Sequence, residues 1–269
     1  DEKNEGAWRR LVFDFRSNDA ILNFVNGAEV ARYSQAGVIT PDHTIRTKDW
    51  PMVVAAPADG KLDDVRQNAQ AAARAFIDKY VAYFERHNAR FDGAKKMLDP
   101  APRVILVPGL GLFGLGRSKK DARIAADLAE AAVEGITDAE AIGRFESISE
   151  ADMFDCEYWS LEQAKLGSAK EPPLAGQIAV ITGAAGAIGF ATAKAFAAAG
   201  AEVALLDLDA GKAKEKAKQI GGGAIGVGCD VTDPQSVRDA FATVVEAFGG
   251  VDILVSNAGI TKDGLLLRQ

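Results

Sequence analysis

The sequence is poor in the residues that most often build disulfides, metal centres and membrane spans. Its two cysteines, Cys156 and Cys229, lie far apart and lack the spacing of a metal or redox motif, which predicts reduced thiols and a cytoplasmic protein. No apolar run reaches the roughly 18 residues that a membrane span needs. An excess of positive charge is also missing, and the net charge of −7 argues against nonspecific binding to nucleic acid or to an anionic membrane.

The clearest pattern is a strand, turn, helix and strand between residues 178 and 207. A β-branched apolar run, 178–181, is followed by a glycine-rich turn, 182–189, and by an alanine-rich helix. A second apolar run ends on Asp207, 18 residues beyond Gly189. This layout predicts a dinucleotide site on a doubly wound parallel sheet, because glycines let the backbone approach phosphates and a helix N-terminus attracts anions. The carboxylate of Asp207 can accept hydrogen bonds from the adenosine ribose.

Two later segments carry polar or small residues at predicted strand ends. Asp230 ends a weak strand, at the sheet edge where ligands of open α/β proteins bind, and its carboxylate can accept from an adenine amino group. The alternative is that the acids of 230–233 only cap the next helix, 234–248, a role that suits Asp233. The small residues at 256–259 leave room for a cofactor against the strand end.

The N-terminal half has a less regular pattern. The predicted elements are strands at 8–15 and 52–56, helices at 20–35, 63–88, 118–135, 138–144 and 150–166, and a hairpin at 104–116. Within the hairpin, 109–116 matches a G-x-G-x-x-G fingerprint. Because Pro108 lies in the turn and no strand with a terminal acid follows, we reject this match as a nucleotide site.

A polar loop predicted at 38–48 gathers chemically useful side chains in the N-terminal half. It carries His43, Arg46 and Lys48, and loops of this composition often line sites for phosphorylated or metal-bound substrates. The alternative is a solvated connection without a binding role.

The C-terminal motifs resemble the short-chain dehydrogenase/reductase family. The resemblance covers 174–269 and rests on TGAAGAIG at 182–189, Asp207, CDVTD at 229–233 and SNAG at 256–259. It implies a Rossmann fold and a nicotinamide cofactor. The residues that it places at the cofactor are Thr182, Gly183, Gly186, Ile188, Gly189, Asp207, Asp230, Val231, Asn257, Ala258 and Gly259.

The glycine turn departs from the family pattern T-G-x-x-x-G-x-G at Ala187, where glycine is usual. We expect the additional methyl group to be tolerated. Gly186 occupies the position that is often Arg or Lys in members that prefer NADP, and Asp207 would repel a 2′-phosphate. The sequence therefore favours NAD over NADP.

The catalytic residues of that family are missing from the sequence. The serine and the Tyr-x-x-x-Lys pair of the family lie beyond the SNAG segment, and 174–269 contains no Tyr-x-x-x-Lys. We therefore expect a fragment of a longer enzyme that carries a cofactor half-site. A nucleotide-binding module without redox chemistry is the alternative.

Three N-terminal segments are similar to the bifunctional rhamnulose-1-phosphate aldolase/short-chain dehydrogenase family. They are TPDHTIRTK at 40–48, GLGLFGLG at 109–116 and EYWSLEQAKLG at 157–167. The resemblance implies an enzyme of deoxysugar catabolism. It would combine zinc-dependent cleavage of a ketose 1-phosphate such as rhamnulose 1-phosphate with NAD-linked oxidoreduction of a small aldehyde or alcohol.

In this interpretation the chain divides into three parts. Residues 1–166 are the C-terminal part of a class II aldolase-like α/β domain, 167–173 are a linker containing two prolines, and 174–269 are the first half of a Rossmann domain. We expect small-molecule substrates and a homo-oligomer. A plain NAD-dependent short-chain dehydrogenase with an unrelated N-terminal domain is the alternative.

The zinc or other divalent ion of a class II aldolase needs several histidines, and this chain has only His43 and His87. We therefore expect the histidine-rich portion of the site to lie upstream of this sequence. His43 stays a candidate substrate or metal group, and Arg46 and Lys48 are candidate phosphate contacts. His87 is interpreted as part of a polar helix end.

Overall fold

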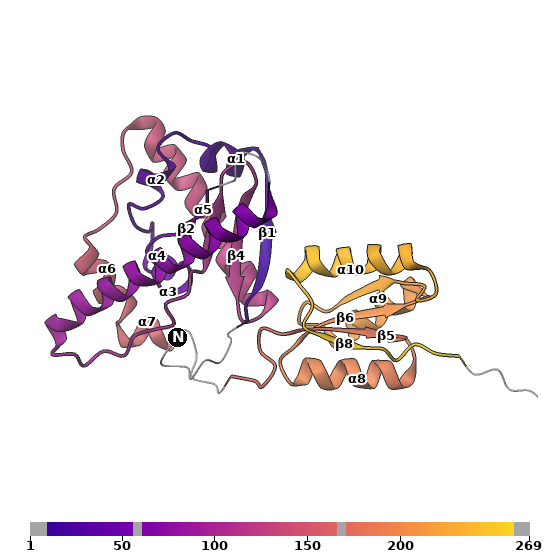
Figure 1. Cartoon of the computed structure of the whole chain (residues 1–269). Coiled ribbons are helices and arrows are strands. Elements are labelled where there is room, and N and C mark those ends of the chain that lie inside the picture. The colour runs from indigo at the N-terminus through magenta and orange to yellow at the C-terminus, as the bar shows by residue number, and fades with distance from the viewer. Residues whose placement is uncertain (1–9, 56–60, 166–170, 261–269) are drawn as a thin grey trace, which may run out of the picture. The chain divides into compact units, whose positions relative to one another are not determined.

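The computed structural model describes residues 10–55, 61–165 and 171–260. Within these ranges, residues 13–55, 61–116 and 121–165 form one compact unit, here the N-terminal unit. Residues 10–12, 117–120 and 171–260 form the other, here the C-terminal unit. Both units mix helices with a four-stranded sheet (Figure 1). Among the described residues, no helix combines the length and the apolar character that crossing a membrane requires.

The C-terminal unit alternates strands with helices. Its elements are β5 (Ile178–Thr182), α8 (Ala187–Ala198), β6 (Glu202–Asp207), α9 (Ala210–Ile220), β7 (Ile225–Gly228), α10 (Pro234–Phe248) and β8 (Ile253–Val255). All pairings are parallel, in the order β7-β6-β5-β8. The chain runs outward from β5 through β6 to β7 and then crosses to β8 on the other side of β5. The carboxyl ends of β5 and β8 therefore form the switch point where doubly wound proteins bind ligands.

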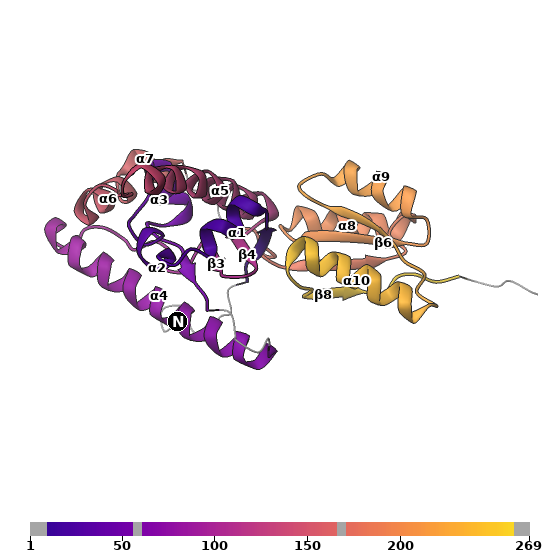
Figure 2. The same ribbon diagram turned by 90° about the horizontal axis from the view of Figure 1, so that it is seen from above.

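Helices cover both faces of this sheet. Ala193 of α8 and Ala217 of α9 pack on the face that includes Ile181, whereas Val244 of α10 packs on the opposite face. Figures 1 and 2 show α8 and α10 on opposite sides of the strands. Because β5 is buried on both faces, it has no polar alternation, as parallel strands require. The predicted Rossmann architecture is confirmed in this unit.

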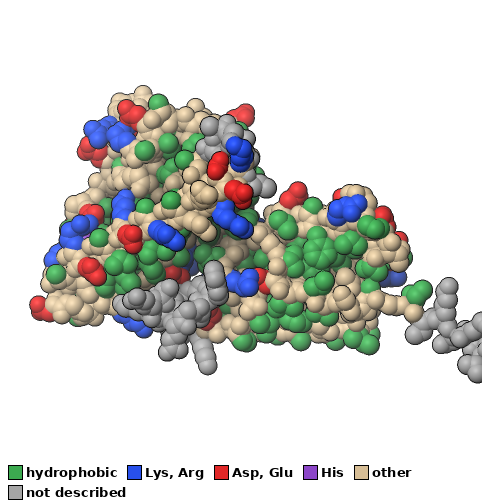
Figure 3. All heavy atoms as spheres, viewed as in Figure 1, with side chains coloured by type: hydrophobic (Ala, Val, Ile, Leu, Met, Phe, Trp, Pro, Cys, Tyr) green, Lys and Arg blue, Asp and Glu red, His purple; other side chains and the backbone are tan. Residues whose placement is uncertain are grey.

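The outer surface of the C-terminal unit is rich in apolar side chains. The space-filling view shows hydrophobic atoms gathered over α10 and β8, with few charged side chains among them (Figure 3). Val245 of α10 and Leu254 of β8 are about half exposed, at 46% and 54%. Within the described residues, β8 is the last strand at its side of the sheet.

The N-terminal unit is built on a sheet of order β1-β4-β3-β2. Its elements are β1 (Val12–Arg16), α1 (Asp19–Val25), α2 (Val30–Tyr33), α3 (Pro41–Thr47), β2 (Met52–Val53), α4 (Leu62–Asn88), a 3₁₀ turn η2 (Ala89–Phe91), β3 (Val104–Val107), β4 (Gly111–Gly116), α5 (Lys119–Ile142), α6 (Glu150–Glu157) and α7 (Ser160–Ala164). Helices α1 and α5 pack against Leu106 and Leu112 of the sheet. Helices α4 and α6 form a separate aromatic cluster around Tyr83 and Phe154.

The predicted hairpin at 104–116 is confirmed by the antiparallel pairing of β3 with β4. Two of its glycines serve close packing. A Cβ on Gly111 would overlap the carbonyl oxygen of Arg16, and one on Gly114 would lie 2.5 Å from the amide nitrogen of Ala126 in α5. Gly109, with a φ of +80°, lies in the turn between the strands. The G-x-G-x-x-G match therefore reflects the turn and the packing of the hairpin.

Several element predictions in the N-terminal unit were wrong. The segment 38–48 is not a loop, because Pro41 at the first helical position starts α3. The helix predicted at 20–35 is α1 and α2, separated after the cap residue Asn26. The stretch 150–166 is also interrupted, since Trp159 takes an extended conformation before α7. Residues 8 and 9 of the predicted strand 8–15, residue 56 of the predicted strand 52–56 and residue 166 of the predicted helix 150–166 lie outside the described residues.

The two helices predicted at 118–135 and 138–144 are one continuous helix, α5. Val133 and Ile136 both lie in the core, on either side of the exposed Gly135. Burial of these two side chains stabilises the helix by more than the roughly 1 kcal/mol that a glycine costs inside a helix. The helix therefore continues past Gly135.

The substitution Gly135→Ala should raise the free energy of unfolding by about 1 kcal/mol, because alanine is the better helix former. The added methyl group would meet only Ile39, at 3.7 Å. Urea unfolding followed by circular dichroism measures the change. Gly114→Ala is the control and should destabilise the unit. A loss of stability in Gly135→Ala would mean that the helix ends there.

Candidate functional site

A groove of about 1090 Å³ lies at the carboxyl ends of the strands in the C-terminal unit. The turns that follow β5, β6, β7 and β8 all contribute to it. Ten of the predicted cofactor residues line this groove, namely Gly183, Gly186, Ile188, Gly189, Asp207, Asp230, Val231, Asn257, Ala258 and Gly259. The eleventh, Thr182, lies behind it and is 7% exposed. The fold thus brings ten of the eleven residues predicted from the sequence motifs together around one groove.

Thr182 and Asn257 join the turn after β5 to the turn after β8. The Thr182 hydroxyl accepts hydrogen bonds from the backbone N–H groups of Asn257 and Ala258, both at 3.0 Å. The side-chain amide of Asn257 donates to the carbonyl of Thr182 at 2.9 Å. The Thr182 hydroxyl itself donates to the carbonyl oxygen of Val255 at 3.4 Å. Because the polar side chain of Thr182 is bonded within the protein, it shapes the groove from behind.

Two glycines are required where these turns meet. Gly183 has a φ of +63°, and a Cβ there would lie 2.9 Å from the Cα of Ala258. A Cβ on Gly189 would lie 2.5 Å from the carbonyl oxygen of Gly183 and 2.7 Å from the side-chain nitrogen of Asn257. Both glycines therefore let the start of α8 lie against the strand ends.

The N-terminus of α8 faces the groove. Gly186 is the cap residue and has no side chain to bond the free N–H groups of the first turn, so these donors are available to an anion. Ala187, the departure from the family glycine pattern, is exposed at the first helical position. Its methyl group is therefore compatible with the helix.

The carboxylate of Asp207 is held in place by backbone N–H groups from two turns, the one after β5 and the one after β6. One carboxylate oxygen accepts from the N–H of Ala185 at 2.9 Å, and the other accepts from the N–H of Asp209 at 3.1 Å. Each oxygen keeps a lone pair for a further donor. The carboxylate is thus oriented before any ligand arrives, as a hydroxyl-binding group should be.

The turn after β7 presents Asp230 and Val231. The hydroxyl and the backbone N–H of Thr232 donate to one Asp230 oxygen at 2.7 and 2.9 Å, and these bonds hold the pKa of the Asp230 carboxyl below its ordinary value. Asp233, as expected, caps α10. Val231 and Leu208 expose apolar side chains on the groove, a surface suited to a flat aromatic ring.

Eight described residues that line the groove were not among the predicted cofactor residues. Four of them lie within the motifs 182–189 and 229–233, and the other four, outside the motifs, are Leu208, Asp209, Lys212 and Ile260. Leu208 directly follows Asp207 in the sequence and is exposed in the structure. An apolar residue just after the acid that ends a strand is a signal by which it could have been identified. Lys212 lies on the helix α9, and its place in the sequence does not indicate that its side chain reaches the groove.

The predicted site residues of the N-terminal unit lie on α3 and at its end. His43 is buried, with its Nδ1 2.8 Å from the Thr40 hydroxyl and its Nε2 3.0 Å from the carbonyl oxygen of Leu128. Burial lowers the pKa of His43. Arg46 donates to the carbonyl oxygen of Lys165 at 3.0 Å.

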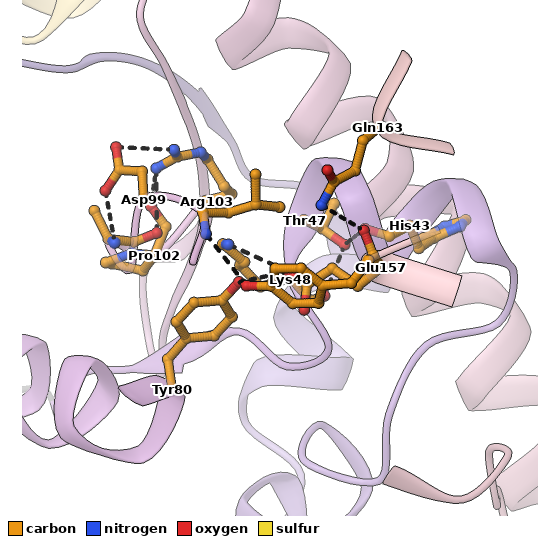
Figure 4. Close-up of polar contacts among 12 residues, drawn as sticks. His43, Thr47, Lys48, Tyr80, Asp99, Pro102, Arg103, Glu157 and Gln163 are labelled. Atoms are coloured by element: carbon orange, nitrogen blue, oxygen red, sulfur yellow. Dashed lines mark hydrogen bonds and ion pairs between the residues drawn. The ribbon is translucent and has the colours of Figure 1, made fainter. Parts of the chain in front are cut away.

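Lys48 points into a buried polar cluster rather than to the surface. Its ammonium group lies 3.3 Å from a carboxylate oxygen of Glu157 and 3.9 Å from the ring centre of Tyr80, and Figure 4 shows the three side chains converging. The Tyr80 hydroxyl also donates to Glu157, at 2.7 Å. Burial lowers the pKa of Lys48. Its backbone has a φ of 68°, a strained conformation for a residue with a side chain.

Asp49 lies beside this ion pair and is 1% exposed. Neither of its carboxylate oxygens has a hydrogen-bond partner among the described residues. Burial, followed by the negative charge of Glu157, raises the pKa of Asp49 to about 7. The cluster thus holds two buried carboxyl groups and one ammonium group.

The described part of the N-terminal unit does not fit a divalent metal ion. Among residues 10–55, 61–165 and 171–260, no three His, Cys, Asp or Glu side chains come together as metal ligands. Both ring nitrogens of His43 already have protein partners, and His87 contacts Glu150 at 2.7 Å instead. No metal step is derived for these residues.

The C-terminal unit thus has a Rossmann-type architecture, by its strand order, its glycine turn and the groove at its strand ends. Comparison with family models agrees. The model for the second domain of class II aldolases matches residues 2–166, and the model for short-chain dehydrogenases matches residues 177–268. The chain belongs to the class II aldolase family, with a short-chain dehydrogenase domain following the aldolase domain.

Individual relatives match one or both parts. An uncharacterized oxidoreductase of Bacillus subtilis is 34% identical over 94% of this chain and 37% of its own length. A D-threitol dehydrogenase of Mycolicibacterium smegmatis is 47% identical over 33% of this chain and 35% of its own. A galactitol 2-dehydrogenase of Agrobacterium fabrum is 48% identical over 31% of this chain and 33% of its own. The chain spans about a third of the length of these relatives.

The substitution Gly189→Ala should lower the free energy of unfolding of the C-terminal unit by about 1–3 kcal/mol, the usual cost of overpacking, because the methyl group would meet the Gly183 carbonyl and the Asn257 amide. Urea unfolding measures this. Gly250→Ala is the control, since nothing lies within 4 Å of its added Cβ. Equal stability of the two variants would contradict the close approach at Gly189.

The substitution Asp49→Asn should stabilise the N-terminal unit at pH 8 and have little effect at pH 4. A raised folded pKa means that the protonated form suits the fold, so stability falls as the pH rises from the unfolded value of roughly 4 through about 7. At pH 8 the gain should reach up to about 4 kcal/mol.

Denaturant unfolding between pH 4 and pH 8 measures this dependence on Asp49. The matched control is Asp78→Asn, an exposed position on α4. A stability difference between Asp49→Asn and wild type that stays constant over the whole range would show that Asp49 is not the titrating group.

Proposed function

We propose that the C-terminal unit binds NAD in its groove. The observation that carries this proposal is the fixed carboxylate of Asp207, held at the carboxyl end of β6 by the N–H groups of Ala185 and Asp209. The two ribose hydroxyls of the adenosine half are the donors that such a carboxylate would accept. The open N-terminus of α8 would face the pyrophosphate, with the glycines at 183 and 189 leaving room for it.

The adenine would lie between the apolar side chains of Leu208 and Val231, with Asp230 next to it. Asn257, Ala258 and Gly259 would line the path toward the nicotinamide. NAD supplies the hydride acceptor when it is bound. The described residues would bind and orient it, since no described group in the groove is a candidate proton donor of the Tyr-x-x-x-Lys type.

We further propose that the whole protein is a bifunctional enzyme of deoxysugar catabolism. It would cleave a ketose 1-phosphate such as rhamnulose 1-phosphate and carry out NAD-dependent oxidoreduction of a small aldehyde or alcohol. The succession of the two family matches supports the combination. Relatives named D-threitol dehydrogenase and galactitol 2-dehydrogenase support a small hydroxylated substrate for the second activity. Both activities are assigned to the protein as a whole, of which this chain would be a part.

The preference for NAD gives the test of the binding proposal. NAD should raise the thermal midpoint of the protein more than NADP does, because the Asp207 carboxylate would bond the ribose and repel a 2′-phosphate. Asp207→Ala should weaken NAD binding roughly 10- to 100-fold, as expected for hydrogen bonds to a charged acceptor. Isothermal titration calorimetry measures both affinities.

The control for Asp207 is Asp239→Ala on α10, which does not line the groove. Its affinity for NAD should equal that of wild type. Equal thermal shifts with NAD and NADP, or an unchanged ratio of affinities in Asp207→Ala, would overturn the role given to Asp207.

A further inference from the structure

One positively charged side chain lines the groove among the described residues, and it is already paired. Lys212, in the first turn of α9, places its ammonium nitrogen 3.1 Å from a carboxylate oxygen of Asp209. The other Asp209 oxygen accepts from the backbone N–H of Lys212 at 3.0 Å, so that Asp209 also caps α9. The bonds to Lys212 keep the pKa of the Asp209 carboxyl below its ordinary value, and Asp209 is therefore ionised at neutral pH.

Asp209 is also connected to the ribose-binding carboxylate. Its backbone N–H donates to Asp207, and Asp207 in turn accepts from Ala185 in the glycine turn. A chain of hydrogen bonds thus runs from the glycine turn through Asp207 and Asp209 to Lys212. This chain places the charge of Asp209 and the charge of Lys212 at the adenosine-ribose end of the groove.

We propose that Asp209 is a second determinant of cofactor choice, which acts against a 2′-phosphate by its own charge and by holding Lys212. The proposal rests on the NAD-binding function proposed above. It assigns to Asp209 a role in cofactor choice that the sequence analysis gave only to Gly186 and Asp207.

The local charge explains why Asp207 alone would not be sufficient to repel a 2′-phosphate. Four charged residues line the groove in the described part of the chain, of which Asp207, Asp209 and Asp230 are acidic and Lys212 is basic. Asp209 pairs with Lys212, so the charge of Lys212 is compensated by Asp209 and not by Asp207. With Asp209 replaced by a neutral residue, Lys212 would be free to compensate Asp207. A phosphate on the 2′ oxygen carries up to two negative charges, so it should be repelled less strongly in that variant.

The pair is exposed, with 69% of the Lys212 side chain and 48% of the Asp209 side chain accessible. Exposed ion pairs hold their partners weakly. Lys212 can therefore turn to a phosphate once Asp209 no longer competes for it, and a phosphate is a strong acceptor for an ammonium group. The expected effect is a change in selectivity rather than in fold.

The test is Asp209→Asn, which removes the charge but keeps a side chain that caps helices as well as aspartate does. Calorimetric titration of the chain should show NADP binding about 3- to 10-fold more tightly than in wild type, with NAD affinity changed less than about twofold. The gain for NADP should shrink as salt is added, because the released interaction is between exposed charges.

The matched control is Asp233→Asn. Asp233 is also the cap of a helix, with bonds to the N–H groups of Gln235 and Ser236, but it does not line the groove. Its variant should bind both nucleotides as wild type does. Similar NADP gains in the two variants would mean that overall charge, and not Asp209, sets the selectivity.

A double variant separates the two parts of the proposal. Adding Lys212→Gln to Asp209→Asn should remove most of the NADP gain, and the difference between the two measures the coupling. A gain that persists in full without Lys212 would overturn the role of the ion pair. Wild-type NAD binding together with unchanged NADP affinity in Asp209→Asn would overturn this inference alone. Wild-type protein that binds neither nucleotide would overturn the proposed function, and this inference with it.

Discussion

The groove of the C-terminal unit depends on the close approach of two turns. The Asn257 amide and the Thr182 hydroxyl bond across the carboxyl ends of β5 and β8, and Gly183 and Gly189 have no side chains to keep the turns apart. This contact fixes the start of α8, and the start of α8 fixes where free N–H groups face the groove. The same glycine turn gives Asp207 the Ala185 N–H to which its carboxylate is bound. The backbone thus sets the geometry of the groove in which we propose that NAD binds.

The C-terminal unit could be predicted from its sequence because its signals are local. Apolar runs of four or five residues, capping acids and glycines mark its elements, and the helix α10 has the predicted bounds. The acid at the end of β6 belongs to the same short pattern. The sequence pattern does not indicate where a side chain points or which residue of another element it contacts. Thr182 points behind the groove, and Lys212 meets Asp209 only because α9 begins at the groove edge.

The N-terminal unit was predicted less well because its structure depends on distant contacts. The segment 41–47 is polar in sequence, yet α3 buries His43 and Thr47 against other elements. Lys48 was expected to face a phosphate, but its partner is Glu157, 109 residues along the chain. The continuity of α5 through Gly135 likewise follows from packing on a sheet whose order the sequence does not state. The family match identifies this unit. The strained backbone of Lys48, and the buried Asp49 carboxyl that has no hydrogen-bond partner among the described residues, set it apart from an ordinary core.

The central claim is that NAD occupies the groove of the C-terminal unit. Amide hydrogen exchange of the chain, measured with and without saturating NAD, tests it most directly. The account predicts slower exchange in the turns 183–189, 207–209 and 229–232, which line the groove, and unchanged exchange in α3 and α6. Binding of NAD that leaves these three turns unprotected, or protection confined to the N-terminal unit, would contradict it.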